Sequence, residues 1–145
     1  MMNIKQIKPE DTYEIRQKVL RPNQTINECK YEGDEFKGSF HIGAFAHEKL
    51  ICIASFYHQA HLEIEGSCQY RLRGMATLEE FRNLKAGSNV IYFAENLLKK
   101  QGADVWWCNA RTDVEAYYQK LGLCKKGDVF NIDPLGPHII MYKML

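Results

Sequence analysis

Two short segments of this chain carry residues whose types and spacing suit chemistry. Arg82 and Lys85 come directly before residues 86–88, Ala-Gly-Ser, which open a strongly periodic helix. The first N–H groups of a helix have no acceptor within it, so together with nearby basic side chains they favour an anion such as phosphate. Tyr118 follows about thirty residues later, and a phenol in hydrogen-bond reach can protonate a leaving group. The residues therefore indicate a site that holds a phosphorylated molecule beside a proton donor.

Three predicted elements must position these residues. Apolar side chains three and four positions apart predict an amphipathic helix over residues 86–101. Residues 104–108, which are apolar after Asp104, predict a central strand. Residues 112–115, Thr-Asp-Val-Glu, form a capping box that predicts a helix ending at Leu121. On that helix Tyr117 shares the buried face with Leu121, which makes Tyr117 the core residue and leaves Tyr118 for chemistry.

The remaining elements are predicted from alternation and turn signals. Asp11 or Thr12 can cap a helix that runs to Leu20, and residues 22–38 form a polar loop with room for a helical turn. Gly74 inside a strand pattern indicates a bulge or a close approach by another group. Strands are predicted at residues 3–8, 41–47, 50–58, 67–77, 123–132 and 137–145, with a tight hairpin at Glu48-Lys49. This order is typical of an α/β domain with a mixed sheet, and residues 1–145 are expected to form one domain.

Composition excludes several classes of protein. Nineteen basic residues nearly balance eighteen acidic ones, for a net charge of +1, which argues against a dedicated nucleic-acid binder. None of the five cysteines forms a Cys-x-x-Cys pair, so neither a zinc site nor a redox motif is indicated. The chain has no signal-peptide pattern and no apolar run as long as a membrane span. We therefore expect a cytoplasmic protein without membrane or nucleic-acid partners.

From about Tyr70 to the C-terminus the sequence resembles the GNAT superfamily of acyl-CoA-dependent N-acetyltransferases, in particular its small stand-alone bacterial members. The family loop Arg/Gln-x-x-Gly-x-Gly/Ala is matched by Arg82-Asn-Leu-Lys-Ala-Gly87, except that Lys85 replaces a glycine. Asn109 and the segment 117–123, Tyr-Tyr-Gln-Lys-Leu-Gly-Leu, resemble the downstream family motif, as does the ending 136–141, Gly-Pro-His-Ile-Ile-Met. The resemblance implies a mixed, mostly antiparallel sheet with helices on both faces and splayed central strands.

The same resemblance implies the activity and its residues. The acetyl group of acetyl-CoA, a co-substrate used without a metal, would pass to a primary amine of a small molecule or peptide by direct attack in a ternary complex. Tyr118 would protonate the departing thiolate, and backbone groups of the strand around Met75 and Thr77 would hold the pantetheine arm. The implied cofactor-binding residues are Met75, Ala76, Thr77, Arg82, Asn83, Lys85, Ala86, Gly87, Ser88, Asn109 and Tyr118.

Several alternatives stay open at this level. The catalytic base is assigned to His138, with His41, Glu79 and Glu80 as other candidates, because a histidine titrates near neutral pH. Cys108 is either a nucleophile or a core side chain. The pair His58-x-x-His61 is interpreted as part of a loop, because no third metal ligand is suitably spaced.

Lys85 raises a different question. If the loop needs a positive φ at this position, lysine there costs roughly 1–2 kcal/mol. Two other interpretations follow from this departure from the family pattern: a catalytically degenerate acyl-CoA-binding module, or a small interaction protein that kept only the fold. The sequence also leaves open a monomer or a homodimer.

Overall fold

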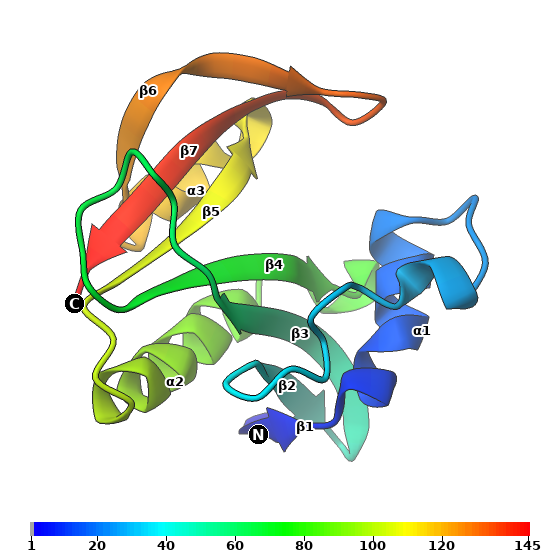
Figure 1. Cartoon of the computed structure of the whole chain (residues 1–145). Helices are drawn as coiled ribbons and strands as arrows, with labels where there is room; N and C mark the ends of the chain where they lie inside the picture. The colour runs from blue at the N-terminus through cyan, green and yellow to red at the C-terminus, as the bar shows by residue number, and fades with distance from the viewer. Residues whose placement is uncertain (1) are drawn as a thin grey trace. The chain divides into compact units, whose positions relative to one another are not determined.

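Seven strands and three α-helices make up the computed structural model, which describes residues 2–145 (Figure 1). Short 3₁₀ turns and one π-helical turn, Arg16–Leu20, link them. The helices are α1 (Tyr13–Ile15), α2 (Ala86–Lys100) and α3 (Glu115–Lys120). The strands are β1 (Met2–Ile7), β2 (Phe40–Ala46), β3 (Lys49–His58), β4 (Gln69–Thr77), β5 (Val105–Arg111), β6 (Cys124–Ile132) and β7 (Gly136–Met144).

The strands are hydrogen-bonded in the order β1-β2-β3-β4-β5-β7-β6 (Figure 1). The pairs β1–β2, β2–β3, β5–β7 and β6–β7 are antiparallel, whereas β4 and β5 are parallel. The parallel pairing covers Gln69–Arg71 and Val105–Trp107, although β4 continues to Thr77 and β5 to Arg111. The mostly antiparallel mixed sheet is therefore confirmed, and the short parallel pairing is what splayed central strands require.

The chain forms two compact units. The first runs from the N-terminus to His58 and includes Leu72–Leu97, and the second contains Gln59–Arg71 and Leu98–Leu145. In the first unit, side chains such as Ile42 and Ile53 are completely buried, as are Val90 and Ala94 on the predicted apolar face of α2. In the second unit, a cluster of Ile64, Val105, Trp107 and Ile140 packs with Phe130 and Tyr142.

Two local predictions were wrong. The turn between β2 and β3 lies at His47 and Glu48, one residue earlier than predicted, because Ala46 pairs with Lys49 and both turn residues have positive φ. No Asn-Gly signal marks that turn in the sequence. The capping box at Thr112 also does not form. Residues Thr112–Val114 wind as a 3₁₀ turn instead, so α3 begins at Glu115 after Val114, without a side-chain cap.

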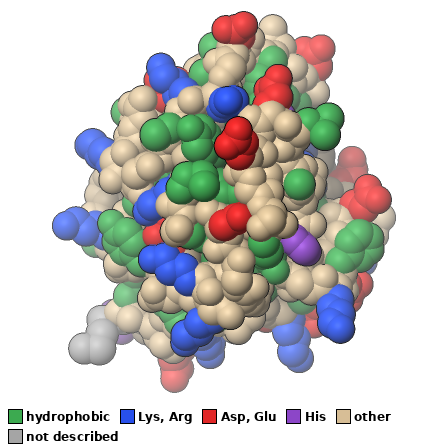
Figure 2. All heavy atoms as spheres, turned by 60° about the vertical axis from the view of Figure 1, so that its left-hand side comes forward, with side chains coloured by type: hydrophobic (Ala, Val, Ile, Leu, Met, Phe, Trp, Pro, Cys, Tyr) green, Lys and Arg blue, Asp and Glu red, His purple; other side chains and the backbone are tan. Residues whose placement is uncertain are grey.

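Charged side chains of both signs stand on the face drawn in Figure 2, with hydrophobic side chains scattered among them. This agrees with the small net charge of the sequence. Within the described residues, the structure contains no helix with the length and apolar character needed to span a membrane.

Candidate active site

The predicted anion-binding turn lies in the first unit, between a 3₁₀ turn (Glu79–Phe81) and α2. Asn83 and Lys85 both have left-handed backbone conformations, with φ of 69° and 63°. The Lys85 carbonyl accepts the N–H of Asn89 at 3.1 Å, so Lys85 is the last residue before the helix. The positive φ that favours glycine is thus present at Lys85, where a lysine adopts it only at a cost in the stability of the fold.

The chemistry of this turn suits a pyrophosphate. Arg82 and Lys85 are exposed, and they precede the first turn of α2, where the N–H groups of residues 86–88 have no acceptor in a preceding turn. The positive end of the helix dipole adds to the charge of the two side chains. The turn therefore presents main-chain donors and cationic side chains close together, and binding of an anion there stays a prediction.

The end of β4, in the same unit, carries the backbone predicted to hold the pantetheine arm. Ala76 is buried, and Met75 and Thr77 are half-buried. The Thr77 hydroxyl donates to the Cys52 sulfur at 3.2 Å, which fixes this side chain. Any role of the three residues toward a ligand therefore falls to their backbone groups, and that role stays a prediction.

Gly74, just before them, has a φ of 63°. A Cβ at this position would lie 3.2 Å from Cε2 of Tyr31 and 3.3 Å from Nε of Arg16. The predicted close approach is confirmed, and the approaching groups are side chains of this chain itself.

Tyr118 lies in the second unit, on α3, and its side chain is half-buried. Burial raises the pKa of Tyr118 well above its usual value, and Cys108 and Tyr117 add to the effect. The phenol therefore keeps its proton at neutral pH, as a general acid must. The carbonyl of Tyr118 accepts the N–H groups of Leu121 and Leu123, both at 3.1 Å, and so closes the helix.

Tyr117 is not the core residue that the sequence predicted. Its side chain is 38% exposed, and its ring packs edge-on against Tyr118 with centroids 5.4 Å apart. The helix has only six residues and begins after Val114, so the apolar stripe is too short to bury Tyr117. Of the two residues predicted to share the buried face, only Leu121, which follows the helix, is buried.

Cys108 and Asn109 follow each other on β5. Cys108 is 3% exposed, and burial raises the pKa of its thiol to about 12, with Arg71 opposing the shift. A thiol in this state is a poor nucleophile, which favours the interpretation of Cys108 as a core side chain. Asn109 is half-buried and pairs with Ile140 of β7, two residues from His138.

His138 is 4% exposed, and its Nδ1 lies 2.8 Å from the carbonyl oxygen of Gly136. A carbonyl oxygen can only accept, so Nδ1 carries a proton and donates it to this bond. Its pairing partner on β5 is Arg111. Nε2 is therefore the ring nitrogen left for a base, and the catalytic role of His138 stays a prediction.

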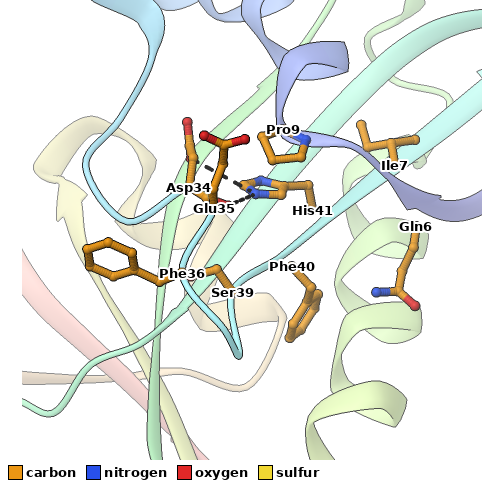
Figure 3. Close-up of a pocket in the computed structure, with 9 residues that line it drawn as sticks. All are labelled: Gln6, Ile7, Pro9, Asp34, Glu35, Phe36, Ser39, Phe40 and His41. Atoms are coloured by element: carbon orange, nitrogen blue, oxygen red, sulfur yellow. Dashed lines mark hydrogen bonds and ion pairs between the residues drawn. The ribbon is translucent and has the colours of Figure 1, made fainter.

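His41, the other histidine candidate, has both ring nitrogens occupied. Nε2 lies 2.9 Å from the carbonyl oxygen of Asp34 (Figure 3), and Nδ1 lies 2.6 Å from the Ser55 hydroxyl. Burial lowers the pKa of His41, whose side chain is neutral in this setting. It borders a hollow of about 320 Å³ in the first unit, lined by Gln6, Ile7, Pro9, Asp34, Glu35, Phe36, Ser39, Phe40 and His41.

Sequence reasoning missed the polar network that surrounds His41. Arg16 is completely buried, and its two terminal nitrogens donate to the Asp34 carboxylate at 2.7 and 3.0 Å. They also donate to the Cys29 carbonyl and to the hydroxyls of Ser55 and Tyr57. No motif signals these partners, because they lie 13 to 41 residues from Arg16 in the sequence.

The described residues offer no candidate metal site. Residues 2–145 contain no group of three or more His, Cys, Asp or Glu side chains placed to hold a metal ion. Of the other base candidates, Glu79 and Glu80 are exposed in the 3₁₀ turn before the anion-binding turn.

Known proteins resemble this chain in sequence and in structure. Residues 3–123 match the acetyltransferase (GNAT) family. The chain is 50% identical over all 145 residues to "Uncharacterized N-acetyltransferase YitI" of Bacillus subtilis (strain 168), of which it covers 97%.

Two solved structures share the fold. A putative N-acetyltransferase from Lactobacillus plantarum superposes with a TM-score of 0.80 at 17% identity, over 99% of this chain and 98% of that one. An aminoglycoside 6′-N-acetyltransferase complexed with coenzyme A gives 0.76 at 14% identity, over 98% and 96% of the two chains. The family match and the sequence identity over the whole chain agree with the architecture: this protein belongs to the GNAT family of acetyltransferases and is an acyltransferase.

Proposed function

We propose that this enzyme transfers the acetyl group of acetyl-CoA directly to a primary amine while both substrates are bound. The amine nitrogen attacks the thioester carbonyl and forms the new C–N bond. The C–S bond then breaks, and the sulfur leaves with its electron pair as a thiolate. The amine loses one proton, and the thiolate gains one from Tyr118, so the products are an acetamide and free coenzyme A.

The anion-binding turn supports the binding half of this proposal. Arg82, Lys85 and the first N–H groups of α2 provide the donors that a pyrophosphate needs. Met75 and Thr77, on the strand that leads to this turn, would hold the pantetheine arm by their backbone and polarise the thioester carbonyl. Asn109 of β5 would donate to the arm. Within the described residues, the side-chain amide of Asn109 makes no hydrogen bond.

The state of Cys108 carries the proposal of direct transfer. A covalent acyl-enzyme needs a thiolate, and Cys108 is 3% exposed with a pKa raised to about 12 by burial. Tyr118, in the same unit, keeps a proton that a leaving thiolate can accept. His138, whose Nδ1 is engaged by the Gly136 carbonyl, would remove the amine proton with Nε2. The buried, protonated thiol of Cys108 and the protonated phenol of Tyr118 fit direct transfer better than an acyl-enzyme.

Initial-rate kinetics with both substrates varied would test the order of events. Direct transfer predicts intersecting double-reciprocal lines, and Cys108→Ala should keep kcat within a few fold of the unsubstituted enzyme. Parallel lines, together with loss of activity in Cys108→Ala and a trapped acetyl group on the protein, would show that the reaction passes through an acyl-enzyme. Mass spectrometry of the protein after mixing with acetyl-CoA alone provides that last measurement.

A further inference from the structure

Three guanidinium groups gather around the ring of Tyr31 in the first unit. The guanidinium carbons of Arg16, Arg73 and Arg21 lie 4.0, 4.6 and 5.4 Å from its centroid. Arg21 also donates from Nε to the Tyr31 hydroxyl at 3.3 Å. Cations over an aromatic face are stabilised by the ring, but three of them around one ring also repel each other.

Among residues 2–145, only one of the three guanidinium groups, that of Arg16, has a carboxylate partner. Arg16 is completely buried and forms a two-pronged ion pair with Asp34, supported by Ser55 and Tyr57. Burial by itself would raise the pKa of Asp34, but hydrogen bonds from Arg16, Tyr57 and the N–H of Tyr31 hold it below its usual value. Asp34 is therefore ionised and its charge is committed to Arg16.

Arg21 and Arg73 are left without a counterion. Both are half-buried, and among residues 2–145 no Asp or Glu oxygen lies within 4.0 Å of either guanidinium. Glu28, close in sequence, accepts from the N–H and hydroxyl of Thr25 at 3.0 and 3.1 Å. The guanidinium carbons of Arg21 and Arg73 are at most 10 Å apart, the sum of their distances to the Tyr31 centroid.

The position of this cluster relates it to the proposed reaction. A Cβ at Gly74 would lie 3.2 Å from Cε2 of the Tyr31 ring, and Arg73 precedes Met75 by two residues on β4. Two residues of strand span about 6.6 Å, so the cluster lies within the length of a small molecule from the backbone proposed to polarise the thioester. The guanidinium carbon of Arg73 also lies 6.0 Å from the centroid of the Tyr57 ring. Tyr57 in turn contacts the buried Arg16–Asp34 pair.

From this arrangement we propose that the acceptor amine carries an anionic group, a carboxylate or a phosphate, which Arg73 and Arg21 bind beside Tyr31. The inference rests on the proposed acetyl transfer to an amine. Guanidinium forks bind both oxyanions in two-pronged geometry, and an oxyanion there would offset the two unpaired charges. The Tyr31 ring, held by Arg16 and Gly74, gives the two arginines a fixed support.

Three small primary amines of similar size test this preference: β-alanine with a carboxylate, O-phosphoethanolamine with a phosphate, and ethanolamine with neither. Calorimetry in the presence of coenzyme A measures their binding, and mass spectrometry of the products measures their acetylation. Arg73→Gln is the test variant, and Lys18→Gln, at an exposed lysine of the same unit, is the matched control. We expect the anionic amines to bind at least tenfold more tightly than ethanolamine, and Arg73→Gln to remove about tenfold to a hundredfold of that affinity.

The outcomes separate this inference from the proposed function. Equal binding of all three amines, no binding of either anionic amine, or an unchanged preference in Arg73→Gln would overturn the anion site. A preference for β-alanine alone or for O-phosphoethanolamine alone would support it and identify the anion as carboxylate or phosphate. Selective binding of anionic amines without acetylation of any of them would keep the anion site and refute their role as acceptors. Arg73→Gln should leave the affinity for coenzyme A unchanged, which distinguishes loss of the acceptor site from loss of the fold.

Discussion

Replacing Lys85 by glycine separates the backbone strain of the anion-binding turn from the charge of its side chain. Lys85 has a φ of 63°, a conformation that costs an L-residue about 1–2 kcal/mol. Glycine removes this cost but gains freedom in the unfolded chain, which offsets about 0.4–1 kcal/mol. Because the lysine side chain is exposed, little packing is lost. We therefore expect Lys85→Gly to raise the free energy of unfolding by about 0.5–1 kcal/mol.

Urea titration and thermal unfolding measure this change, which corresponds to a rise in Tm of roughly 2–4 °C for a chain of this size. Glu48→Gly is the matched control, because Glu48 has a φ of 66° in the exposed turn between β2 and β3. It should stabilise the fold by a similar amount. If Lys85→Gly destabilises while Glu48→Gly stabilises, the lysine side chain contributes to the fold and the strain reasoning is refuted.

The same variant reports on the charge of Lys85. If the ammonium reaches a phosphate, Lys85→Gly exchanges a charge contact for a better-shaped loop, so the affinity for coenzyme A should change little. Its dependence on salt concentration should fall, because one screened interaction is removed. Calorimetry at two ionic strengths measures both effects. A gain in affinity beyond tenfold would show instead that the lysine obstructs the site.

Three further predictions concern other parts of the molecule. Arg82→Ala should weaken binding of coenzyme A by about 1.5–3 kcal/mol, the range for a hydrogen bond to a charged group, and unchanged affinity by calorimetry would remove Arg82 from the site. Tyr118→Phe should lower kcat by roughly 10²–10³-fold with unchanged cofactor affinity and Tm, because it removes only the proton of the phenol. Tyr117→Phe is the control and should leave kcat near that of the unsubstituted enzyme. If steady-state assays give the reversed result, Tyr117 is the proton donor. Asp34→Asn should destabilise the fold by about 3–5 kcal/mol, because it leaves the charge of Arg16 buried without a partner. The folded-state pKa of Asp34 is lowered, so its contribution is present above about pH 4 and is lost as the pH falls through that lowered pKa. Urea titrations across acidic pH should therefore show a loss of stability that the variant lacks.

Local patterns in the sequence determined most of the elements. The apolar spacing over residues 86–101 corresponds to α2, which spans Ala86–Lys100, and the apolar run near residue 105 corresponds to the central strand β5. These predictions succeed because helix and strand periods depend on neighbours within a few residues. The turn before α2 was predictable for the same reason, since it joins a helix start to basic residues close in sequence, and its binding of an anion stays a prediction.

Tyr117 shows a limit of prediction from local sequence patterns. Its spacing from Leu121 is that of a buried stripe, but the length of the helix decides whether a stripe is buried, and α3 has only six residues. The capping box failed for a related reason: the chain leaves β5 in a 3₁₀ turn, which places Thr112 inside the turn instead of at the helix start.

Only the tertiary structure decided the surroundings of Arg16 and Tyr31. The sequence presents Arg16 as one more basic residue of a short helix, whereas folding brings Asp34, Ser55 and Tyr57 to its guanidinium. Hydrogen bonds and ion pairs between residues far apart in sequence leave no periodic signal, because each needs only one residue of the right type at one position. The sequence by itself therefore determined most of the elements and the resemblance to the family, and the fold decided which charged side chains are paired.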